Sequence, residues 1–276
     1  MNVLFLNAGR RCELIKAFKR VLSKFPGGGL VYASDITPTA PALQIVDGKV
    51  IFPHSTDSDF KKQFVDFCLE KNIDLVIPTI DPDLLVLDNL RQELEVLLPE
   101  VTLLLPNSKL VQISSNKLLT KKEMISIGVK VPLEVDPQQE NIEFPLFIKP
   151  ISGSAAIGTA KVNDEGDLKS CLKSLEEPIL EEFISGAEYT VDVFCNKDAK
   201  ALLAIPRKRL AVRGGEVAKG IIERDVELEK IACFVAESLE CDSPITIQFI
   251  KRDDEYVLIE INARLGGGLP LSIASG

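Results

Sequence analysis

Short apolar runs alternate with segments of helical periodicity over residues 1 to about 106. The apolar runs predict strands at residues 3–6, 30–33, 50–52, 75–77 and 102–105. Between the first two strands, apolar residues from Leu14 to Phe25 recur on one face of a helix. Strands that alternate with helices are typical of βαβ units, so this part predicts an α/β fold with a doubly wound parallel sheet.

The pattern changes after Pro145, where strands separated by tight turns predominate. The predicted strands are residues 146–149, 159–162, 179–183, 189–195, 201–205, 245–250 and 256–262. Helices are predicted at residues 164–175 and around residues 228–239, and residues 106–132 form a helical connection. We therefore expect an α+β second part with mostly antiparallel strands. The predicted domains are residues 1–106 and 107–276, the second with a truncated end that lacks a closing helix.

The composition is that of an ordinary globular protein, with 46% apolar and 26% charged residues. The chain carries 32 basic and 41 acidic residues, and the resulting net charge of −9 disfavours a broad nucleic-acid interface. No apolar run reaches the roughly 18 to 20 residues of a membrane-spanning helix, and the start does not resemble a signal peptide. The six cysteines are scattered and His54 is the single histidine, so a histidine-rich zinc site is excluded. These features predict a cytoplasmic protein without a membrane partner.

Polar groups follow the predicted strands of the first part, at residues 7–11, at Asp35 and at residues 79–83. In a doubly wound sheet these loops face the ligand, and Asn7, Arg10, Arg11 and Asp81 are weak candidates for binding one. The loop at residues 7–11 lacks the three-glycine dinucleotide fingerprint. A nicotinamide-dependent enzyme therefore stays only an alternative.

Hard oxygen donors gather on the last predicted strand pair. Glu260 and Asn262 alternate with apolar residues and so share one face of their strand. A three-residue turn centred on Asp254 would place Gln248 opposite Glu260. Three such donors suit Mg²⁺ or Mn²⁺, with phosphate oxygens completing the shell. Arg264 follows closely and could neutralise a transferring phosphoryl group, although a solvated strand end is the simpler interpretation of this segment alone.

Three further segments bear on phosphate and nucleotide binding. Lys149 ends a strand and precedes a loop of small residues at positions 151–158, which would let backbone N–H groups approach phosphates. Residues 179–188 combine an apolar strand that contains two adjacent acids with a turn and a further acid, which suits an adenine edge and a ribose. Lys117 lies near a helix start. Taken singly, each segment also fits a plain hairpin, solvated carboxylates or a surface lysine.

In this order the segments resemble the ATP-grasp superfamily, and within it the carbamoyl-phosphate synthase large chain in a short, single-unit form. The resemblance implies that Lys117 and Lys149 bind phosphates, that Glu188 binds the ribose and that Arg264 acts at the reacting phosphoryl group. It also implies three sets of residues: a flap with Ser152, Gly153, Ser154 and Ala155, an adenine hinge with Glu181, Glu182, Phe183 and Ile184, and metal ligands Gln248, Glu260 and Asn262. The segment from Arg207 to Lys219 resembles a basic loop over the triphosphate, and no single residue in it is assigned a role.

The resemblance implies a Rossmann-like parallel domain followed by an ATP-grasp fold of two subdomains with mainly antiparallel sheets. It implies ATP and Mg²⁺ or Mn²⁺ as cofactors, and a ligase that phosphorylates a carboxylate or bicarbonate-like substrate and joins it to an amine. It allows a homodimer, and it implies small-molecule substrates rather than nucleic acid. The alternative is a catalytically inactive ATP-binding module with a regulatory or assembly role.

Overall fold

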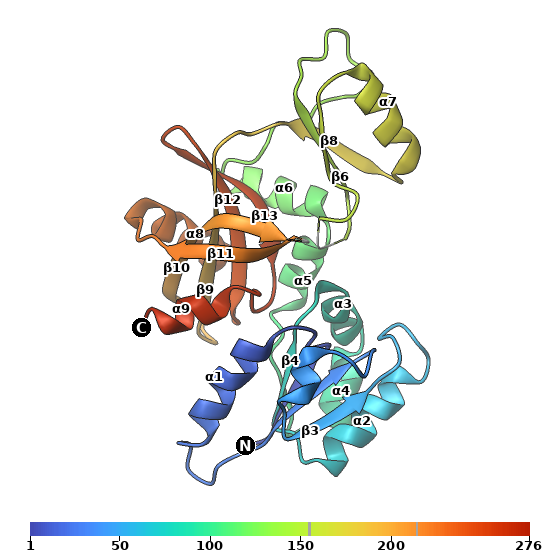
Figure 1. The fold of residues 1–276 in the computed structure, drawn as a ribbon, viewed down its shortest axis with the longest axis vertical. Helices are drawn as coiled ribbons and strands as arrows, with labels where there is room; N and C mark the ends of the chain where they lie inside the picture. The colour runs from blue at the N-terminus through green and yellow to red at the C-terminus, as the bar shows by residue number, and fades with distance from the viewer. Residues whose placement is uncertain (154–155, 214) are drawn as a thin grey trace. The chain divides into compact units, whose positions relative to one another are not determined.

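The computed structural model describes residues 1–153, 156–213 and 215–276 (Figure 1). The chain forms two compact units, one of residues 1–111 with 263–276 and the other of residues 112–262. The division at residue 111 falls inside α5 (Ser108–Ser115). Residues 263–276 therefore belong to the first unit, whereas the predicted domains, 1–106 and 107–276, are separated by a single boundary.

The first unit is built on one parallel sheet. Its strands are β1 (Val3–Leu6), β2 (Val31–Asp35), β3 (Gly48–Ile51), β4 (Leu75–Pro78) and β5 (Thr102–Leu103), in the order β3-β2-β1-β4-β5. Its helices are α1 (Cys12–Leu22), η1 (Pro41–Gln44), α2 (Phe60–Glu70), α3 (Asp81–Asn89), α4 (Arg91–Leu97) and α9 (Leu269–Ala274). All four strand pairs are parallel, as the alternating pattern predicts.

Burial explains why the first unit takes this form. All four residues of the central strand β1 are buried, which is typical of a strand covered on both faces of a parallel sheet. Helix α1 buries Leu14 and Ile15, so its apolar face packs inward. On α2 the rings of Phe60 and Phe64 stack with centroids 5.6 Å apart, and Phe52 meets both rings edge-on.

Helix α9 corrects one expectation, because the sequence interpretation has no helix after the glycine-rich turn. In the structure Leu269–Ala274 is helical and packs beside α1 within the first unit. Gly268 is the N-cap residue and Pro270 stands in the first helical turn, where the missing N–H of proline costs no intrahelical hydrogen bond.

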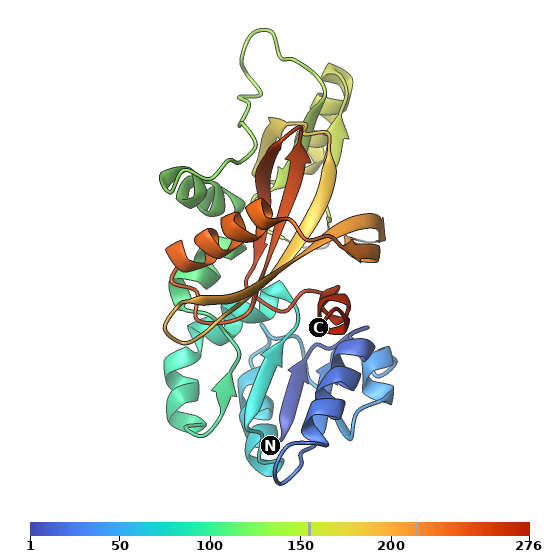
Figure 2. The same ribbon diagram turned by 90° about the vertical axis from the view of Figure 1, so that its left-hand side faces the viewer.

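The second unit contains two antiparallel sheets, which Figure 2 shows from the side. The smaller sheet has the order β7-β6-β8 and consists of β6 (Leu146–Pro150), β7 (Ala160–Val162) and β8 (Pro178–Glu182). The larger sheet has the order β11-β10-β9-β12-β13 and consists of β9 (Ala187–Cys195), β10 (Ala201–Arg213), β11 (Glu216–Ile222), β12 (Ile245–Arg252) and β13 (Glu255–Asn262). The helices are α6 (Lys117–Ser126), α7 (Glu165–Ser174) and α8 (Val226–Ser238). The predicted mainly antiparallel architecture is confirmed.

Strands β10 and β11 correct a second expectation. The predicted strand ends at residue 205, before Pro206, and the following basic stretch is predicted as a loop. In the structure β10 continues to Arg213 and pairs with β11. Pro206 pairs with Val191 of β9, but its carbonyl accepts from the N–H of Glu223, so its nitrogen faces the β11 side. Proline is tolerated there because the ladder with β11 begins only at Arg207.

A buried ion pair ties together three strands of the larger sheet. Arg207 on β10 donates from Nε and Nη2 to the carboxylate of Asp192 on β9, over 2.8 and 3.0 Å. The hydroxyl of Thr246 on β12 donates to the same carboxylate over 3.2 Å. The Arg207 and Asp192 side chains are only 1% and 2% exposed, so neither charge has water as a substitute partner.

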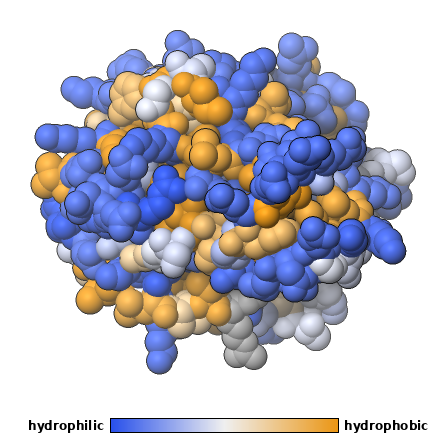
Figure 3. All heavy atoms as spheres, turned by 90° about the horizontal axis from the view of Figure 1, so that it is seen from above, coloured by the Kyte–Doolittle hydropathy of each residue, from blue (hydrophilic) through white to orange (hydrophobic). Residues whose placement is uncertain are grey.

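Hydrophilic residues surround separate hydrophobic areas on the face of the molecule drawn in Figure 3. In the part of the chain that the structure describes, no helix is long and apolar enough to cross a bilayer.

Substitution of Asp192 by alanine is expected to lower the free energy of unfolding by about 3–5 kcal/mol, because it leaves the Arg207 charge buried without its partner. Urea denaturation followed by circular dichroism measures this change. The control is Glu165→Ala, which removes an ion pair to Lys169 whose side chains are 75% and 74% exposed. That control should cost less than about 1 kcal/mol, and equal losses in the two variants would contradict the role of burial.

Candidate active site

The pairing of β12 with β13 brings two predicted metal ligands face to face. Gln248 lies opposite Glu260, as predicted. The predicted three-residue turn is wrong, however, because Arg252 pairs with Glu255 across a two-residue turn. The register shifts by one residue beyond Phe249, which pairs with Leu258, so a β-bulge supplies the offset that brings Gln248 to Glu260. Bulges re-aim side chains in this way.

The two side chains are in direct contact. Nε2 of Gln248 donates to Oε2 of Glu260 over 2.6 Å. Asn262, two residues further along β13, lies opposite Thr246 and is 8% exposed. Glu260 and Asn262 therefore follow one another on the strand beside Gln248, and each of the three offers a side-chain oxygen.

Arg209 on β10 joins this group, whereas the sequence interpretation placed it in the basic loop over the triphosphate without a role of its own. Its Nη1 donates to Oε1 of Gln248 over 2.5 Å and lies 3.2 Å from Oε2 of Glu188 on β9. The antiparallel register of β9 and β10 pairs Arg207 with Thr190, which brings Arg209 level with Glu188. This register could have identified Arg209 if the predicted strand had not ended at residue 205.

Lys149 lies in a buried cluster around one carboxylate. Its Nζ is 2.7 Å from Oε2 of Glu181, and Nζ of Lys121 is 3.1 Å from Oε1 of the same residue. The Lys149, Glu181 and Lys121 side chains are all less than 10% exposed. The sequence interpretation missed Lys121, although it stands four residues after Lys117 and thus one turn further along the same face of α6.

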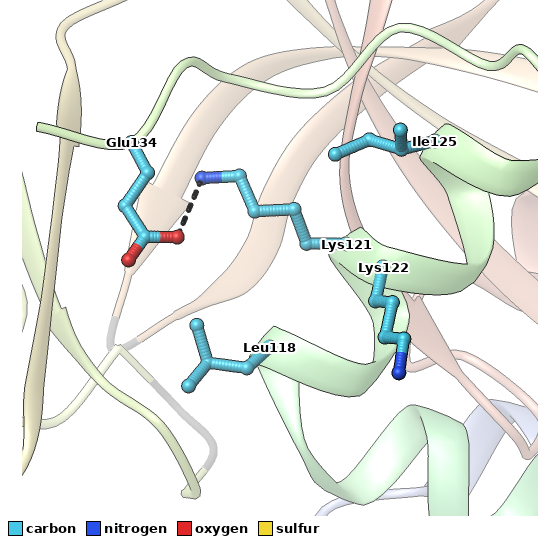
Figure 4. A pocket seen from close by; sticks show the side chains of 5 residues that line it. All are labelled: Leu118, Lys121, Lys122, Ile125 and Glu134. Atoms are coloured by element: carbon cyan, nitrogen blue, oxygen red, sulfur yellow. Dashed lines mark ion pairs between the residues drawn. The ribbon is translucent and has the colours of Figure 1, made fainter.

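Lys121 also borders an open pocket of about 220 Å³ on α6 (Figure 4). Its ammonium group points across this pocket to Glu134, with 3.7 Å between Nζ and Oε2. The remaining lining residues are Leu118, Lys122 and Ile125. The same lysine thus connects the buried carboxylate of Glu181 with an exposed one.

Lys117 contacts the predicted flap rather than the carboxylate of Glu181. Its Nζ donates to the carbonyl of Gly153 over 3.0 Å, and its N–H donates to the carbonyl of Ile151. Ser152 and Gly153 are exposed. Gly153 has φ +119°, a left-handed conformation that favours glycine. The flap residues Ser154 and Ala155 lie outside the described residues.

The residues of the predicted adenine hinge do not share one environment: Glu181 belongs to the buried lysine cluster, and the three residues after it do not. The side chain of Glu182 turns to the other face, where it accepts from Nη1 of Arg252 over 2.7 Å and from the N–H of Leu133 over 3.0 Å. The chain leaves the strand at residues 183–185, before β9 begins. Phe183 lies under Nζ of Lys161, which is 4.3 Å from the ring centroid, and Ile184 is buried.

Arg264 belongs to the first unit, in which it forms a bidentate ion pair with Asp81 at the start of α3. The Nε–Oδ1 and Nη2–Oδ2 distances are 2.9 and 2.7 Å. Two parallel hydrogen bonds fix the plane of the guanidinium, so Asp81 orients Arg264.

The polar loops of the first unit meet at one sheet edge, as their positions after the strands predict. The N–H of Gly9 donates to Oδ2 of Asp35 over 2.9 Å, and the Thr79 hydroxyl donates to the carbonyl of Asn7 over 2.6 Å. The Asn7 amide donates to Oδ2 of Asp83 over 2.7 Å. Burial raises the pKa of Asp83, although the hydrogen bonds from Asn7 and Ser55 act in the opposite direction.

Comparison with known families agrees with this arrangement. Residues 114–268, more than half of the chain, match the family described as the ATP-grasp domain. The chain belongs to the ATP-grasp family. Residues 3–101 match a second family, described as the PylC-like N-terminal domain. The ATP-grasp match covers the lysines of α6 and β6, the hinge and the last strand pair.

Individual relatives extend over different parts of this ATP-grasp chain. The D-alanine–D-alanine ligase of Fusobacterium nucleatum is 27% identical over 165 residues, which cover 56% of this chain and 58% of that ligase. The carbamoyl-phosphate synthase of Methanobrevibacter smithii is 27% identical over 252 residues, which cover 84% of this chain and 67% of that protein.

A solved structure supports the fold. The biotin carboxylase domain of Hydrogenobacter thermophilus 2-oxoglutarate carboxylase, in complex with MgADP and bicarbonate, superposes with a TM-score of 0.72 at 18% identity. The match covers 98% of this chain and 65% of that one. At this identity the likeness shows a shared fold and nothing further.

Replacing Glu181 with glutamine is expected to lower the free energy of unfolding by about 3–5 kcal/mol, because Lys121 and Lys149 would stay buried without their carboxylate. Chemical denaturation gives the value. The neighbouring substitution Glu182→Gln is the matched control, since its partner Arg252 is 39% exposed. We expect that control to lose at most about 1 kcal/mol. A loss no larger for Glu181→Gln than for Glu182→Gln would show that the cluster does not depend on its shared carboxylate.

Proposed function

We propose that this protein is an ATP-dependent ligase that phosphorylates a carboxylate or bicarbonate-like substrate and joins the acylphosphate to an amine. The observation that carries the proposal is the contact between Gln248 and Glu260 across β12 and β13, beside Asn262. Such a donor set, at the end of a rigid strand pair, fits a magnesium-bound triphosphate.

The donors fit Mg²⁺ because they are oxygens only, and the proposal extends to Mn²⁺, which accepts the same ligands. Among the residues that the structure describes, no group of three or more His, Cys, Asp or Glu side chains forms a metal site. The metal would therefore rest on one carboxylate, two amide oxygens and the oxygens of the nucleotide. When bound, it supplies charge neutralisation on the triphosphate.

The nucleotide would lie along the other predicted residues. Lys117 and Lys149 would bind phosphate oxygens, and the loop at residues 152–158 would cover them. The peptide groups of Phe183 and Ile184 stand where the chain leaves β8, which suits an adenine edge. The half-exposed carboxylate of Glu188 would accept hydrogen bonds from the ribose hydroxyls.

The reaction then needs little covalent participation from the protein. A substrate carboxylate oxygen attacks the γ-phosphorus, the bond to the β–γ bridging oxygen breaks, and ADP leaves. An amine attacks the acyl carbon, phosphate leaves and the amine nitrogen loses a proton. The protein contributes by positioning the reactants and by screening the charge on the phosphoryl group.

Arg264 would supply part of that screening, with Asp81 holding its guanidinium in a fixed plane. The acceptor substrate would bind at the strand-end loops of the first unit, around Asn7, Arg10, Arg11 and Asp81. We also propose the two domains of residues 1–106 and 107–276, of which the first would bind the acceptor substrate and the second would bind ATP.

Among ligases we propose the carbamoyl-phosphate synthase type. The long match to the Methanobrevibacter protein and the glutamine at the first metal position support this choice. Six free cysteines and a net charge of −9 support a reducing cytoplasm and small-molecule substrates rather than nucleic acid. We also propose a homodimer, which is supported by the dimer of the structurally similar biotin carboxylase domain of 2-oxoglutarate carboxylase.

A substrate screen tests the activity directly. Amino acids and small carboxylates, with bicarbonate among them, are added to the protein with ATP and Mg²⁺, and released ADP is measured. Stimulation by a carboxylate together with an amine supports the ligase. ATP binding without stimulated ADP release by any compound would favour the inactive module instead.

Glu260→Ala is expected to lower substrate-stimulated ADP formation by roughly a hundredfold or more, because it removes the charged oxygen ligand of the metal. The control is Glu255→Ala on the same strand, where the side chain is 49% exposed and pairs with Lys130. The control should retain the wild-type rate and both variants should keep the wild-type circular dichroism spectrum. Wild-type activity in Glu260→Ala would remove the assignment of the metal site.

A further inference from the structure

The side chain of Arg209 contacts two residues to which the proposed function gives other partners. Gln248 is a proposed metal ligand, and Glu188 is proposed to bind the ribose. Nη1 of Arg209 lies 2.5 Å from Oε1 of Gln248 and 3.2 Å from Oε2 of Glu188, and its Nη2 donates to the carbonyl of Gly215 over 3.1 Å. One guanidinium thus bridges the proposed metal ligand and the proposed ribose ligand.

The Arg209 side chain is 8% exposed, and its buried Nε has no hydrogen-bond partner among the described residues. A buried guanidinium with an unmet donor is a site at which an anion gains a further hydrogen bond. The surroundings of Arg209 therefore satisfy its charge only in part.

The contact with Gln248 has a direct consequence for a divalent cation. The nitrogen of the Gln248 amide is turned toward Glu260, so Oε1 is the atom left for a metal, and Arg209 already donates to it. A divalent cation on that oxygen would stand next to the positive guanidinium in a poorly hydrated site, where like charges repel strongly. Metal binding therefore requires that Arg209 leave or that its charge be neutralised.

A nucleoside triphosphate can do both. Its phosphates offer Arg209 a bidentate anionic partner. Its ribose hydroxyls would donate hydrogen bonds to Glu188, which pairs with Arg209 in this structure. The backbone of β10 is held nearby by the buried pair of Arg207 and Asp192, so the change can be limited to the Arg209 side chain.

We propose that Arg209 couples metal binding to nucleotide binding in this site. Without nucleotide its guanidinium holds Gln248 and keeps the affinity for a divalent cation low. With nucleotide it turns to the phosphates and releases Gln248 to the metal. The inference rests on the proposed function, because it takes Gln248 as a metal ligand and Glu188 as a ribose ligand. Coupling of this kind is reciprocal, so the metal must also raise the affinity for the nucleotide.

The test measures binding rather than turnover. Mn²⁺ binding is followed by the electron paramagnetic resonance signal of the free ion, without nucleotide, in the wild type and in Arg209→Met. We expect the variant to bind Mn²⁺ about tenfold more tightly than the wild type, within the usual range of coupling between sites. Calorimetry with adenylyl imidodiphosphate at saturating Mn²⁺ should show weaker nucleotide binding by the variant, because a phosphate partner is lost.

Lys208→Met is the matched control, since it removes the same charge one residue earlier, where the side chain points to the other face and pairs with Glu223. It should bind Mn²⁺ like the wild type. Arg209→Gln is a second variant with the same expectation as Arg209→Met, because it also removes the charge but keeps a polar side chain beside Gln248 and Glu188.

Two results separate the coupling from the proposed function. If Mn²⁺ affinity without nucleotide is no higher in either Arg209 variant, while Glu260→Ala abolishes Mn²⁺ binding with nucleotide, the coupling role is overturned and the metal site stands. If the wild type binds no Mn²⁺ with or without the nucleotide analogue, the metal site and the coupling are both overturned.

Discussion

Charges that are buried between strands need an opposite charge nearby, and this constraint shapes the second unit. Arg207 and Asp192 form an ion pair inside the larger sheet, and Glu181 forms ion pairs with two lysines at the smaller one. Each such group gives up hydration, which the protein interior must replace with hydrogen bonds and opposite charge. These ion pairs therefore connect β10 to β9 in the larger sheet, and connect α6 and β6 to β8 at the smaller one.

The same constraint explains why the side chains of the candidate site are paired with one another. Lys149 forms an ion pair with Glu181, and Lys117 donates to the Gly153 carbonyl. Arg209 donates to Gln248 and forms an ion pair with Glu188. A magnesium-bound triphosphate brings both signs of charge to such a site, so it can exchange partners with these residues without leaving a buried charge alone. Arg209 is the residue at which this exchange would reach the proposed metal ligands.

Much of the fold was predictable because the apolar periodicity of each segment reflects local burial. The five parallel strands and the antiparallel strands other than β11 follow from it, and most of their boundaries shift by a few residues. The failures have local causes. Pro206 ends a strand by the usual rule, yet β10 continues because the ladder with β11 begins after it. Helix α9 follows the glycine-rich turn as a short helix, and it packs against α1 from the other end of the chain, which the local pattern does not record.

By itself the sequence determined which chemical groups stand on each strand and helix, and hence that oxygen donors, lysines and an arginine would be offered in ATP-grasp order. The sequence also predicted that Gln248 lies opposite Glu260, but only the tertiary structure showed that a β-bulge, and not a three-residue turn, produces this pairing. The tertiary structure alone decided that strand pairing brings Arg209 beside Glu188. The reason is physical: periodicity along a chain records whether a side chain is buried, whereas the partner of a buried charge depends on distances between segments far apart in sequence.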